Sequence, residues 1–266
     1  MEFAAAALGL IIGSFLNVLI LRTGTDEGVG GRSRCARCRH QLAWHDLIPV
    51  ISWVTLGGRC RYCRARISIQ YPMVEAGTAA LFFAFASSWL PVLPLIMTFG
   101  IIALYVAITV FDLHHSLIPD EWNYAAAIFA LVYGYLLYGS ESPILFILAG
   151  PVAALPLFLL WSYSRGAWMG FGDVKLALSF GWILGPLHGF VAVMFAFVIG
   201  AVVSVAILLP LSTILTFAQR RGWISLSGTR ASFTMQSEVP FGPFLIASCI
   251  TLWLSLLYGI PIPLIP

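Results

Sequence analysis

Long apolar runs separated by short polar connections dominate this sequence. A helix that crosses a bilayer needs about 20 mainly apolar residues. The sixth run is short and contains Gly185 and Pro186, and the seventh is long enough to tilt, or to break near Pro210. The pattern therefore predicts an all-α polytopic membrane protein with about eight transmembrane helices, over 3–21, 73–90, 92–111, 122–138, 143–163, 175–187, 189–217 and 241–258.

The composition agrees with a membrane protein. Of the 266 residues, 60% are hydrophobic and only 9% are charged, and a soluble domain of this size would need more charge on its surface. The apolar runs are continuous rather than short and alternating, which argues against a β-barrel. No basic segment precedes residues 3–21 and no cleavage site of small residues follows them, so we expect a retained helix rather than a signal peptide.

Charge is concentrated in one part of the chain. Nine of the 14 Lys and Arg residues lie between Arg22 and Arg66, together with three acidic residues. Binding of nucleic acid would be one use for this charge, but no aromatic or recognition motif accompanies it, so we expect no nucleic-acid partner. Arginine and lysine are instead enriched in cytoplasmic loops of membrane proteins. The charge therefore predicts that residues 22–72 are cytoplasmic.

The other connections fit this orientation. Counting crossings places 112–121, 164–174 and 218–240 on the cytoplasmic side, and the last two contain Arg165, Arg220, Arg221 and Arg230. We therefore divide the chain into a first transmembrane helix, a cytoplasmic zinc-binding segment and a transmembrane bundle that carries the catalytic site, over 1–21, 22–72 and 73–266.

Two C-x-x-C pairs lie in the basic segment, Cys35 with Cys38 and Cys60 with Cys63. Each pair can present two thiolates to one tetrahedral Zn²⁺ ion. A metal would also stabilise a loop of about 45 residues, which is too small for a core of its own. Disulfides or free thiols are the alternatives, and disulfides are disfavoured in a reducing cytoplasm. The spacing predicts a structural zinc site with these four cysteines as ligands, whereas Cys249 is expected to pack inside its helix.

Two glycines, Gly57 and Gly58, come just before the second cysteine pair. They permit a tight turn, or they allow the backbone to approach a ligand closely, in which case Gly58 would belong to a cofactor site. The sequence leaves both interpretations open.

Acidic residues in or beside spanning helices are costly, so each is a candidate functional residue. Asp112 is expected at the cytoplasmic end of the third helix and Asp173 at the cytoplasmic start of the sixth. Two carboxylates that meet in a partly desolvated site share one proton, which is the chemistry of aspartyl proteases. A structural role is the alternative for Asp173, as a cap of its helix, and this role is favoured for Asp120.

The residues around Asp173 form the pattern G-x-G-D. Gly170 and Gly172 have no side chains, so a substrate backbone would be able to approach the carboxylate. Lys175 follows closely and is expected to stabilise negative charge there. The G-x-G-D pattern alone is weak evidence for a catalytic aspartate.

Five segments, taken together and in order, carry a resemblance over nearly the whole chain. They are GSFLNVLILR, the stretch with both C-x-x-C pairs that ends in QYPMVE, DLHHSLIPD, GFGDVK and VPFGPFL, over 13–22, 35–75, 112–120, 170–175 and 239–245. They resemble the bacterial prepilin peptidases, the leader peptidases of type IV pilus and type II secretion systems. One departure is Ala36, where many members have proline, and this is not a ligand position.

The resemblance implies an intramembrane aspartyl protease of the G-x-G-D class with Asp112 and Asp173 as its catalytic pair. It implies that the substrate is a type IV prepilin or pseudopilin, whose basic leader is removed at the cytoplasmic face of the bacterial inner membrane. Many members then N-methylate the new N-terminus with S-adenosylmethionine, an activity usually tied to the cysteine-bearing part. No Gly-rich nucleotide fingerprint for this cofactor is present, so methyl transfer rests on the resemblance alone.

Two other classes of function compete with this interpretation. A membrane transporter or channel would use the acidic residues as an ion path, and it would place charges at mid-membrane depth within inverted repeats. A membrane-anchored zinc module would bind a partner protein and keep the aspartates only for structure. We expect prepilin substrates and membrane lipid as the partners.

Overall fold

The computed structural model describes residues 1–23, 30–139, 142–208 and 240–261. Within these ranges the regular structure is helical, and pairing of extended chain is confined to two isolated bridges, Arg34 with Gln41 and Arg59 with Arg66. The elements are α1 (Glu2–Arg22), η1 (Trp44–Leu47), α2 (Ile51–Thr55), α3 (Gln70–Ala86), α4 (Val92–His115), α5 (Asp120–Tyr138), α6 (Pro143–Ser164), α7 (Phe171–Val203), the π-helix η2 (Ser204–Leu208) and α9 (Gly242–Leu257).

A helix covers each predicted span within the described residues, with its ends displaced by a few residues. At the second span, α3 ends at Ala86 rather than near residue 90. The reason is local, because the Ser87 and Ser88 hydroxyls donate to carbonyls of the last turn at 2.9 and 2.6 Å. Several predicted features lie outside the described residues, namely Pro210 and Arg220, Arg221 and Arg230.

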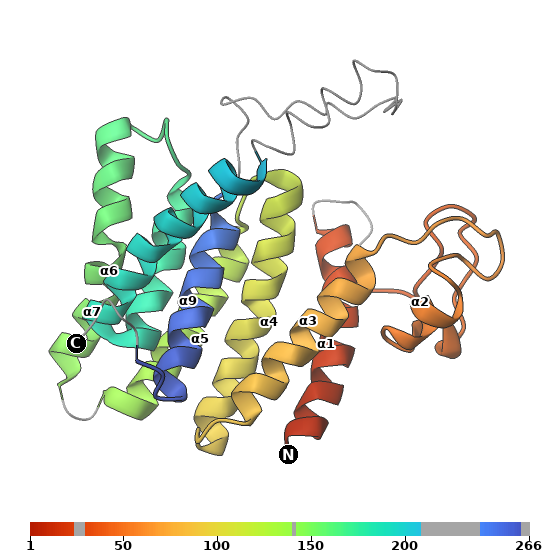
Figure 1. Ribbon diagram of the computed structural model, residues 1–266, viewed down its shortest axis with the longest axis horizontal. Coiled ribbons are helices and arrows are strands. Elements are labelled where there is room, and N and C mark those ends of the chain that lie inside the picture. The colour runs from red at the N-terminus through yellow and green to blue at the C-terminus, as the bar shows by residue number, and fades with distance from the viewer. Residues whose placement is uncertain (24–29, 140–141, 209–239, 262–266) are drawn as a thin grey trace.

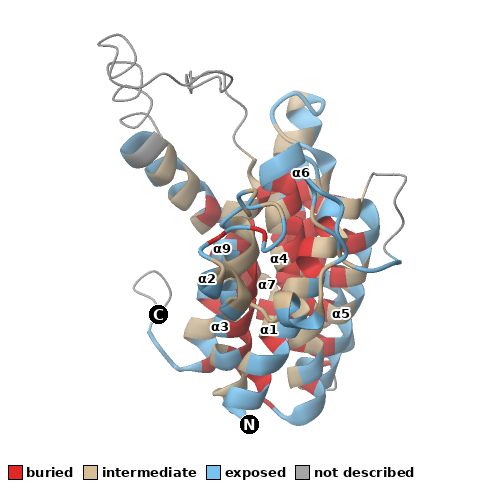
Figure 2. Cartoon of the chain, turned by 90° about the vertical axis from the view of Figure 1, so that its right-hand side faces the viewer, coloured by how far each residue is buried: buried red, intermediate tan, exposed pale blue. Residues whose placement is uncertain are grey.

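Four helical segments are long and apolar enough to cross a membrane, which are α1, α4, α6 and the segment from Phe171 to Ala206, although this last one is interrupted at Gly185. The apolar helix α9 is shorter. Large apolar side chains such as Ile11 and Ile144 are exposed on the outside of the molecule, while buried residues gather between the helices (Figure 2). This distribution fits a multi-pass protein whose outer surface faces lipid.

The α7 segment contains a reversal at Gly185. This residue has φ 82° and ψ 172°, a conformation that favours glycine, and Pro186 follows it. A Cβ on Gly189 would lie 2.8 Å from the Cα of Gly181, although residues eight apart in a straight helix are separated by about 12 Å. The chain therefore turns back on itself here, a few residues before the predicted connection near residue 188.

The helices form two groups (Figure 1). Helices α4, α5, α6, α7 and α9 make the main bundle, and α1 pairs with α3 beside it, with the loop that carries α2 projecting beyond this pair. Small residues allow α1 and α3 to approach closely, because a Cβ on Gly9 or Gly13 would lie 2.7 Å from a Cα of α3. We refer to residues 30–69 as the cysteine segment.

Candidate active site and metal centre

Asp112 lies in the last turn of α4 and is 4% exposed. The backbone N–H of Gly242, the first residue of α9, donates to its Oδ2 at 3.1 Å. A Cβ on Gly242 would lie 2.6 Å from the same oxygen, so this close approach requires glycine. Because free N–H groups at a helix N-terminus favour negative charge, the contact favours the ionised form of this carboxyl group.

Asp173 lies in the first turn of α7 and is 8% exposed. The N-cap of α7 is Gly170 and no side chain caps the helix, so the capping alternative for Asp173 is wrong. The two aspartates are near enough for the charge of Asp112 to act on the Asp173 carboxyl. In the described part of the chain neither carboxyl forms an ion pair. The structure thus brings together the two aspartates that the sequence singles out.

The connection between α4 and α5 packs against both sides of this site. Cβ atoms on Gly172 and Gly242 would lie 3.1 and 3.4 Å from atoms of the Ile118 side chain. The Nδ2 of Asn123 donates to the Gly172 carbonyl at 2.9 Å. Three segments far apart in the sequence, which are the α4–α5 connection and the starts of α7 and α9, therefore meet around the two aspartates.

The other predicted residues near Asp173 differ in their surroundings. Among the described residues, apart from its chain neighbours, the nearest atoms to a Cβ on Gly170 would be the Gly172 nitrogen at 3.9 Å and the Asp173 Oδ2 at 4.0 Å, so that part of the chain leaves space beside this carboxylate. Gly172 instead gives room to a packed side chain. The Lys175 ammonium donates to Asp120 Oδ1 at 2.7 Å, so its charge is engaged outside the aspartate pair. Asp120 is the first residue of α5 and does not cap it.

The four cysteines of the two C-x-x-C pairs form a cluster. Their sulfur atoms all lie within 4.8 Å of one another, and the Sγ atoms of Cys35 and Cys63 are 3.8 Å apart. Four sulfurs at about 2.3 Å from a central ion stand about 3.8 Å apart in a tetrahedron. The cysteines are therefore placed to bind a metal ion.

Each cysteine pair sits in the same kind of turn. The N–H of Cys35 donates to the carbonyl of His40, and the N–H of Cys60 donates to that of Ala65, at 3.0 and 2.8 Å. Arg39 and Arg64 occupy equivalent positions with φ of 55° and 58°. Backbone hydrogen bonding from Cys38 lowers the pKa of the Cys35 thiol, while the nearby Cys35 thiolate helps to raise that of Cys38, so without a cation one thiolate of the cluster disfavours the next. Thiolates are the form that binds metal.

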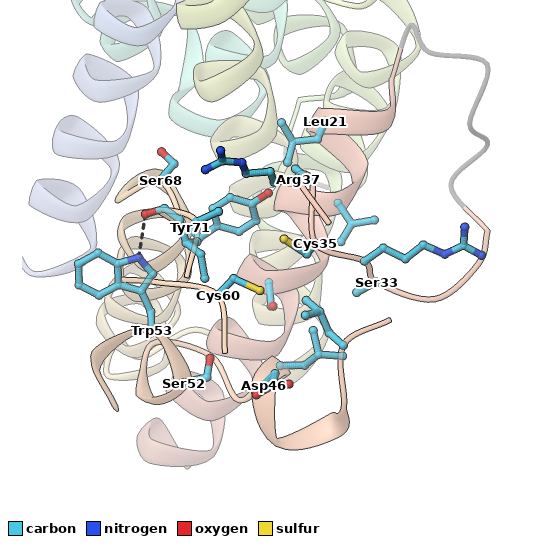
Figure 3. A pocket seen from close by; sticks show the side chains of 18 of the residues that line it. Leu21, Ser33, Cys35, Arg37, Asp46, Ser52, Trp53, Cys60, Ser68 and Tyr71 are labelled. Carbon is cyan, nitrogen blue, oxygen red and sulfur yellow. Dashed lines mark hydrogen bonds between the residues drawn. The ribbon is translucent and has the colours of Figure 1, made fainter. Parts of the chain in front are cut away.

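A cavity of about 910 Å³ lies between α1, α3 and the cysteine segment. Figure 3 shows side chains that line it, from Leu21 on α1 to Trp53 in the cysteine segment and Tyr71 on α3. Gly58 lies behind this wall with φ 65°, and a Cβ there would be 2.9 Å from the Trp53 ring. Gly58 therefore supports a residue of the cavity wall.

Some of these residues gave no signal in the sequence. Trp53 and Tyr71 fall within the segment 35–75 that carries the family resemblance, but that resemblance does not show that they line a cavity, and only the fold does. The signal for Gly242 was its place in the PFGP segment before the last apolar run, but that pattern does not show which group its N–H contacts.

Comparisons with known proteins agree with the two groups of helices. A family profile described as "Bacterial Peptidase A24 N-terminal domain" matches residues 7–89, and one described as "Type IV leader peptidase family" matches residues 99–205. No solved structure matches the chain.

Curated relatives share the printed name "Prepilin leader peptidase/N-methyltransferase". The chain is 30% identical to the protein of this name from Stutzerimonas stutzeri, over 96% of this chain and 90% of that protein. The protein from Aeromonas hydrophila is 29% identical over 94% of this chain and 88% of its own length. The protein from Myxococcus xanthus is 33% identical over 76% of this chain, and the match spans 62% of that protein.

Proposed function

Since the chain belongs to the type IV leader peptidase family, we propose that it removes the leader peptides of type IV prepilins or pseudopilins and that Asp112 and Asp173 are its catalytic pair. The observation that supports the assignment is that these two buried carboxyl groups, without an ion-pair partner among the described residues, are near enough for the charge of one to act on the other. Burying a carboxylate within a membrane protein is costly, so such groups are usually present because function requires them.

The unequal surroundings of the two carboxyl groups suggest their roles. Asp112 accepts the Gly242 N–H, so we assign it as the ionised group that takes a proton from the attacking water. Asp173 is the protonated group, which donates to the carbonyl oxygen of the scissile peptide. The water oxygen adds to the carbonyl carbon. The carbon–nitrogen bond then breaks as the nitrogen receives the proton held by Asp112, and the hydroxyl formed from the carbonyl oxygen returns its proton to Asp173 as the new carboxyl group forms. The open space beside Gly170 is where the substrate backbone would lie.

Within the described ranges, nothing in the fold favours a transporter or channel. An ion path needs charged groups at mid-membrane depth, whereas Asp112 and Asp173 lie at the end of one helix and the start of another. We assign this end of the bundle to the cytoplasmic side of the membrane. This orientation assumes eight crossings, with the parts of α7 before and after Gly185 counted as two of them. A reporter fused near Gly30 should then read as cytoplasmic, and one at the C-terminus as external.

For the cysteine cluster we propose a structural Zn²⁺ ion held by Cys35, Cys38, Cys60 and Cys63. The sulfur spacing fits a tetrahedral shell. The cysteine segment has little buried apolar surface of its own, since Cys60 is its only buried hydrophobic residue among those described. A metal would supply stability that packing does not.

The second proposed activity is N-methylation of the new N-terminal residue with S-adenosylmethionine as the methyl donor. The printed name of the relatives supports this activity. Gly58 is our candidate for a residue that shapes the cofactor site, because it supports Trp53 in the cavity wall.

The peptidase assignment is tested with purified protein and a prepilin substrate. Asp112→Asn and Asp173→Asn should each abolish cleavage, because both carboxyl groups must exchange protons during turnover. Glu121→Gln, a change at an exposed position of α5, is the control and should cleave normally. Near wild-type cleavage by either Asp variant would refute the assignment.

A further inference from the structure

The cavity between α1, α3 and the cysteine segment is separate from the aspartate pair, since neither Asp112 nor Asp173 lines it. Its volume of about 910 Å³ is at the upper end of the roughly 300–1,000 Å³ that is usual for ligand sites. It therefore has room for a nucleoside-sized molecule and a peptide terminus together.

Glu75 on α3 lines this cavity and is only 6% exposed. The backbone N–H of Val50 donates to its Oε2 at 2.7 Å. In the described chain Glu75 forms no ion pair, unlike Asp46, the other acidic residue of the wall, which is 2.7 Å from Arg61. A buried carboxylate without a cationic partner offers its charge to a cationic ligand.

The backbone that holds Glu75 is strained. Val50 has φ 61° and ψ −51°, a region that β-branched residues rarely adopt. Such conformations persist where the surrounding structure imposes them, and they cluster at ligand sites. The strain at Val50 therefore marks the place where the cysteine segment closes onto α3.

Gln70 is a second polar group in the wall. Its Oε1 is 2.7 Å from Nε2 of His114, which lies two residues after Asp112 on α4. Its buried Nε2 has no hydrogen-bond partner among the described residues. An unpaired buried donor is costly, and a ligand carbonyl oxygen that reached this amide would supply the missing acceptor. Gln70 also links the cavity to the helix end that carries Asp112.

The rest of the wall supplies groups for an anion and for a planar ring. Trp53 and Tyr71 provide aromatic surface. Guanidinium groups bind carboxylates in a paired geometry. Seven arginines line the cavity, which are Arg22, Arg32, Arg34, Arg37, Arg39, Arg61 and Arg66.

From these contacts we infer that the cavity binds the sulfonium methyl donor beside the amine to be methylated, and that Glu75 accepts the proton of that amine. The inference rests on the proposed N-methyltransferase function and names its site. The amino-acid carboxylate of the donor would meet the arginines, and its base would meet the aromatic surface. The α-ammonium of the cleaved pilin would meet Glu75, and a peptide carbonyl near it would meet Gln70.

The chemistry balances with these residues. The α-ammonium of the cleaved pilin gives one proton to Glu75 and becomes a neutral amine. The nitrogen lone pair then forms a bond to the methyl carbon, while the carbon–sulfur bond breaks and its electrons remain on sulfur as a neutral thioether. The product is an N-methylammonium group, and Glu75 returns its proton to solvent.

The first experiment measures binding rather than turnover. S-adenosylhomocysteine, the demethylated donor, binds without reacting, and calorimetry on the full-length protein in detergent gives its Kd. Val18→Trp fills the cavity from α1 and Ser68→Trp fills it from the cysteine segment, because both residues line it. Each should weaken binding at least tenfold. Leu8→Trp places the same side chain on an exposed face of α1 and should leave the Kd unchanged.

Metal content and prepilin cleavage show whether each filled variant is folded. Wild-type Kd in both variants, with both folded, would overturn the location of the site. If one variant misfolds, the other decides. Wild-type protein that binds no S-adenosylhomocysteine would also overturn it.

The second experiment tests Glu75 with a pre-cleaved pilin peptide at saturating donor. Glu75→Gln should lower the methylation rate about a hundredfold while the Kd of S-adenosylhomocysteine changes less than threefold. Because a free α-amino group loses its proton near pH 8, raising the pH should restore much of the rate in the variant but little in the wild type. Glu121→Gln is the control and should methylate normally.

The two failures can be told apart. If the wild type binds S-adenosylhomocysteine but methylates no pilin peptide, the proposed methyltransferase function fails, while the binding experiment still decides the location of the site. If the wild type methylates and Glu75→Gln does so at the same rate at pH 7, the role of Glu75 is refuted.

Discussion

Replacing Gly242 by alanine should disable the peptidase by displacing a single oxygen atom. The new Cβ would lie 2.6 Å from Asp112 Oδ2, and ordinary contact begins at 3.4 Å, so the carboxylate must retreat by the difference of about 0.8 Å. A displacement near 1 Å at a reacting group costs roughly a hundredfold in rate. The N–H contact at 3.1 Å, a hydrogen bond to a charged group worth about 1.5–3 kcal/mol, would be lost or lengthened. We therefore expect prepilin cleavage to fall roughly a hundredfold.

The assay is the initial rate of prepilin cleavage by purified protein, followed by mass spectrometry. Gly200→Ala is the matched control, because its Cβ would lie 3.5 Å from a ring atom of Phe244 on α9, which is ordinary contact. Methylation of a pre-cleaved pilin peptide should be normal in both variants if the second site is separate. Cleavage by Gly242→Ala within threefold of the Gly200→Ala rate would show that the contact does not position Asp112.

Three further changes test the metal, the ion pair and the glycine turn. Elemental analysis should find one zinc ion per chain, and Cys60→Ser should remove it and destabilise the cysteine segment more than the bundle; active, reduced protein without zinc would contradict this. Lys175→Ala removes a partly exposed ion pair with Asp120, so it should change cleavage less than threefold and thermal stability little; complete loss of cleavage would place its ammonium in the catalytic site after all. Gly57→Ala and Gly58→Ala strain the backbone similarly at φ 59° and 65°, but only the Cβ at Gly58 would contact the Trp53 indole. Methylation should therefore fall further in Gly58→Ala than in Gly57→Ala. Equal losses would show that only the backbone conformation of the turn matters.

The sequence predicted the elements of the fold well because long apolar runs have few alternatives in a membrane protein. Runs such as 92–111 must form hydrogen bonds within themselves in lipid, and the helix is the structure that does so locally. The ends of the helices were less predictable. Extension of α3 to residue 90 was predicted from apolarity, but two serine hydroxyls after Ala86 end the helix by binding its last carbonyls. The position of the reversal at Gly185 depends on one residue's φ, which composition does not report.

At the candidate site, too, some features were predictable from the sequence and others were not. The aspartate pair and the four cysteines were recognisable because charged and thiol side chains are conspicuous within apolar or basic surroundings. The expectation that Lys175 supports the pair came from its nearness to Asp173 in sequence, whereas the turn of the helix directs its ammonium to Asp120. Contacts made by backbone atoms, such as the N–H of Gly242 and that of Val50, have no signature in side-chain identity. Those contacts come from pairings more than 20 residues apart, which only the folded chain defines.

Both sites use one physical device, a buried carboxylate that accepts a backbone N–H and has no cationic partner among the described residues. At the aspartate pair the donor belongs to the start of α9, where several N–H groups lack partners within the helix and favour negative charge. At the cavity the donor is Val50, which precedes a short helix of five residues. Neither carboxylate has a cation beside it in the described chain, and a lysine or arginine there would hold the charge and reduce its basicity. A neutral donor fixes the position of the oxygen and leaves the carboxylate able to accept a proton, which is what peptide hydrolysis and amine methylation both require of it.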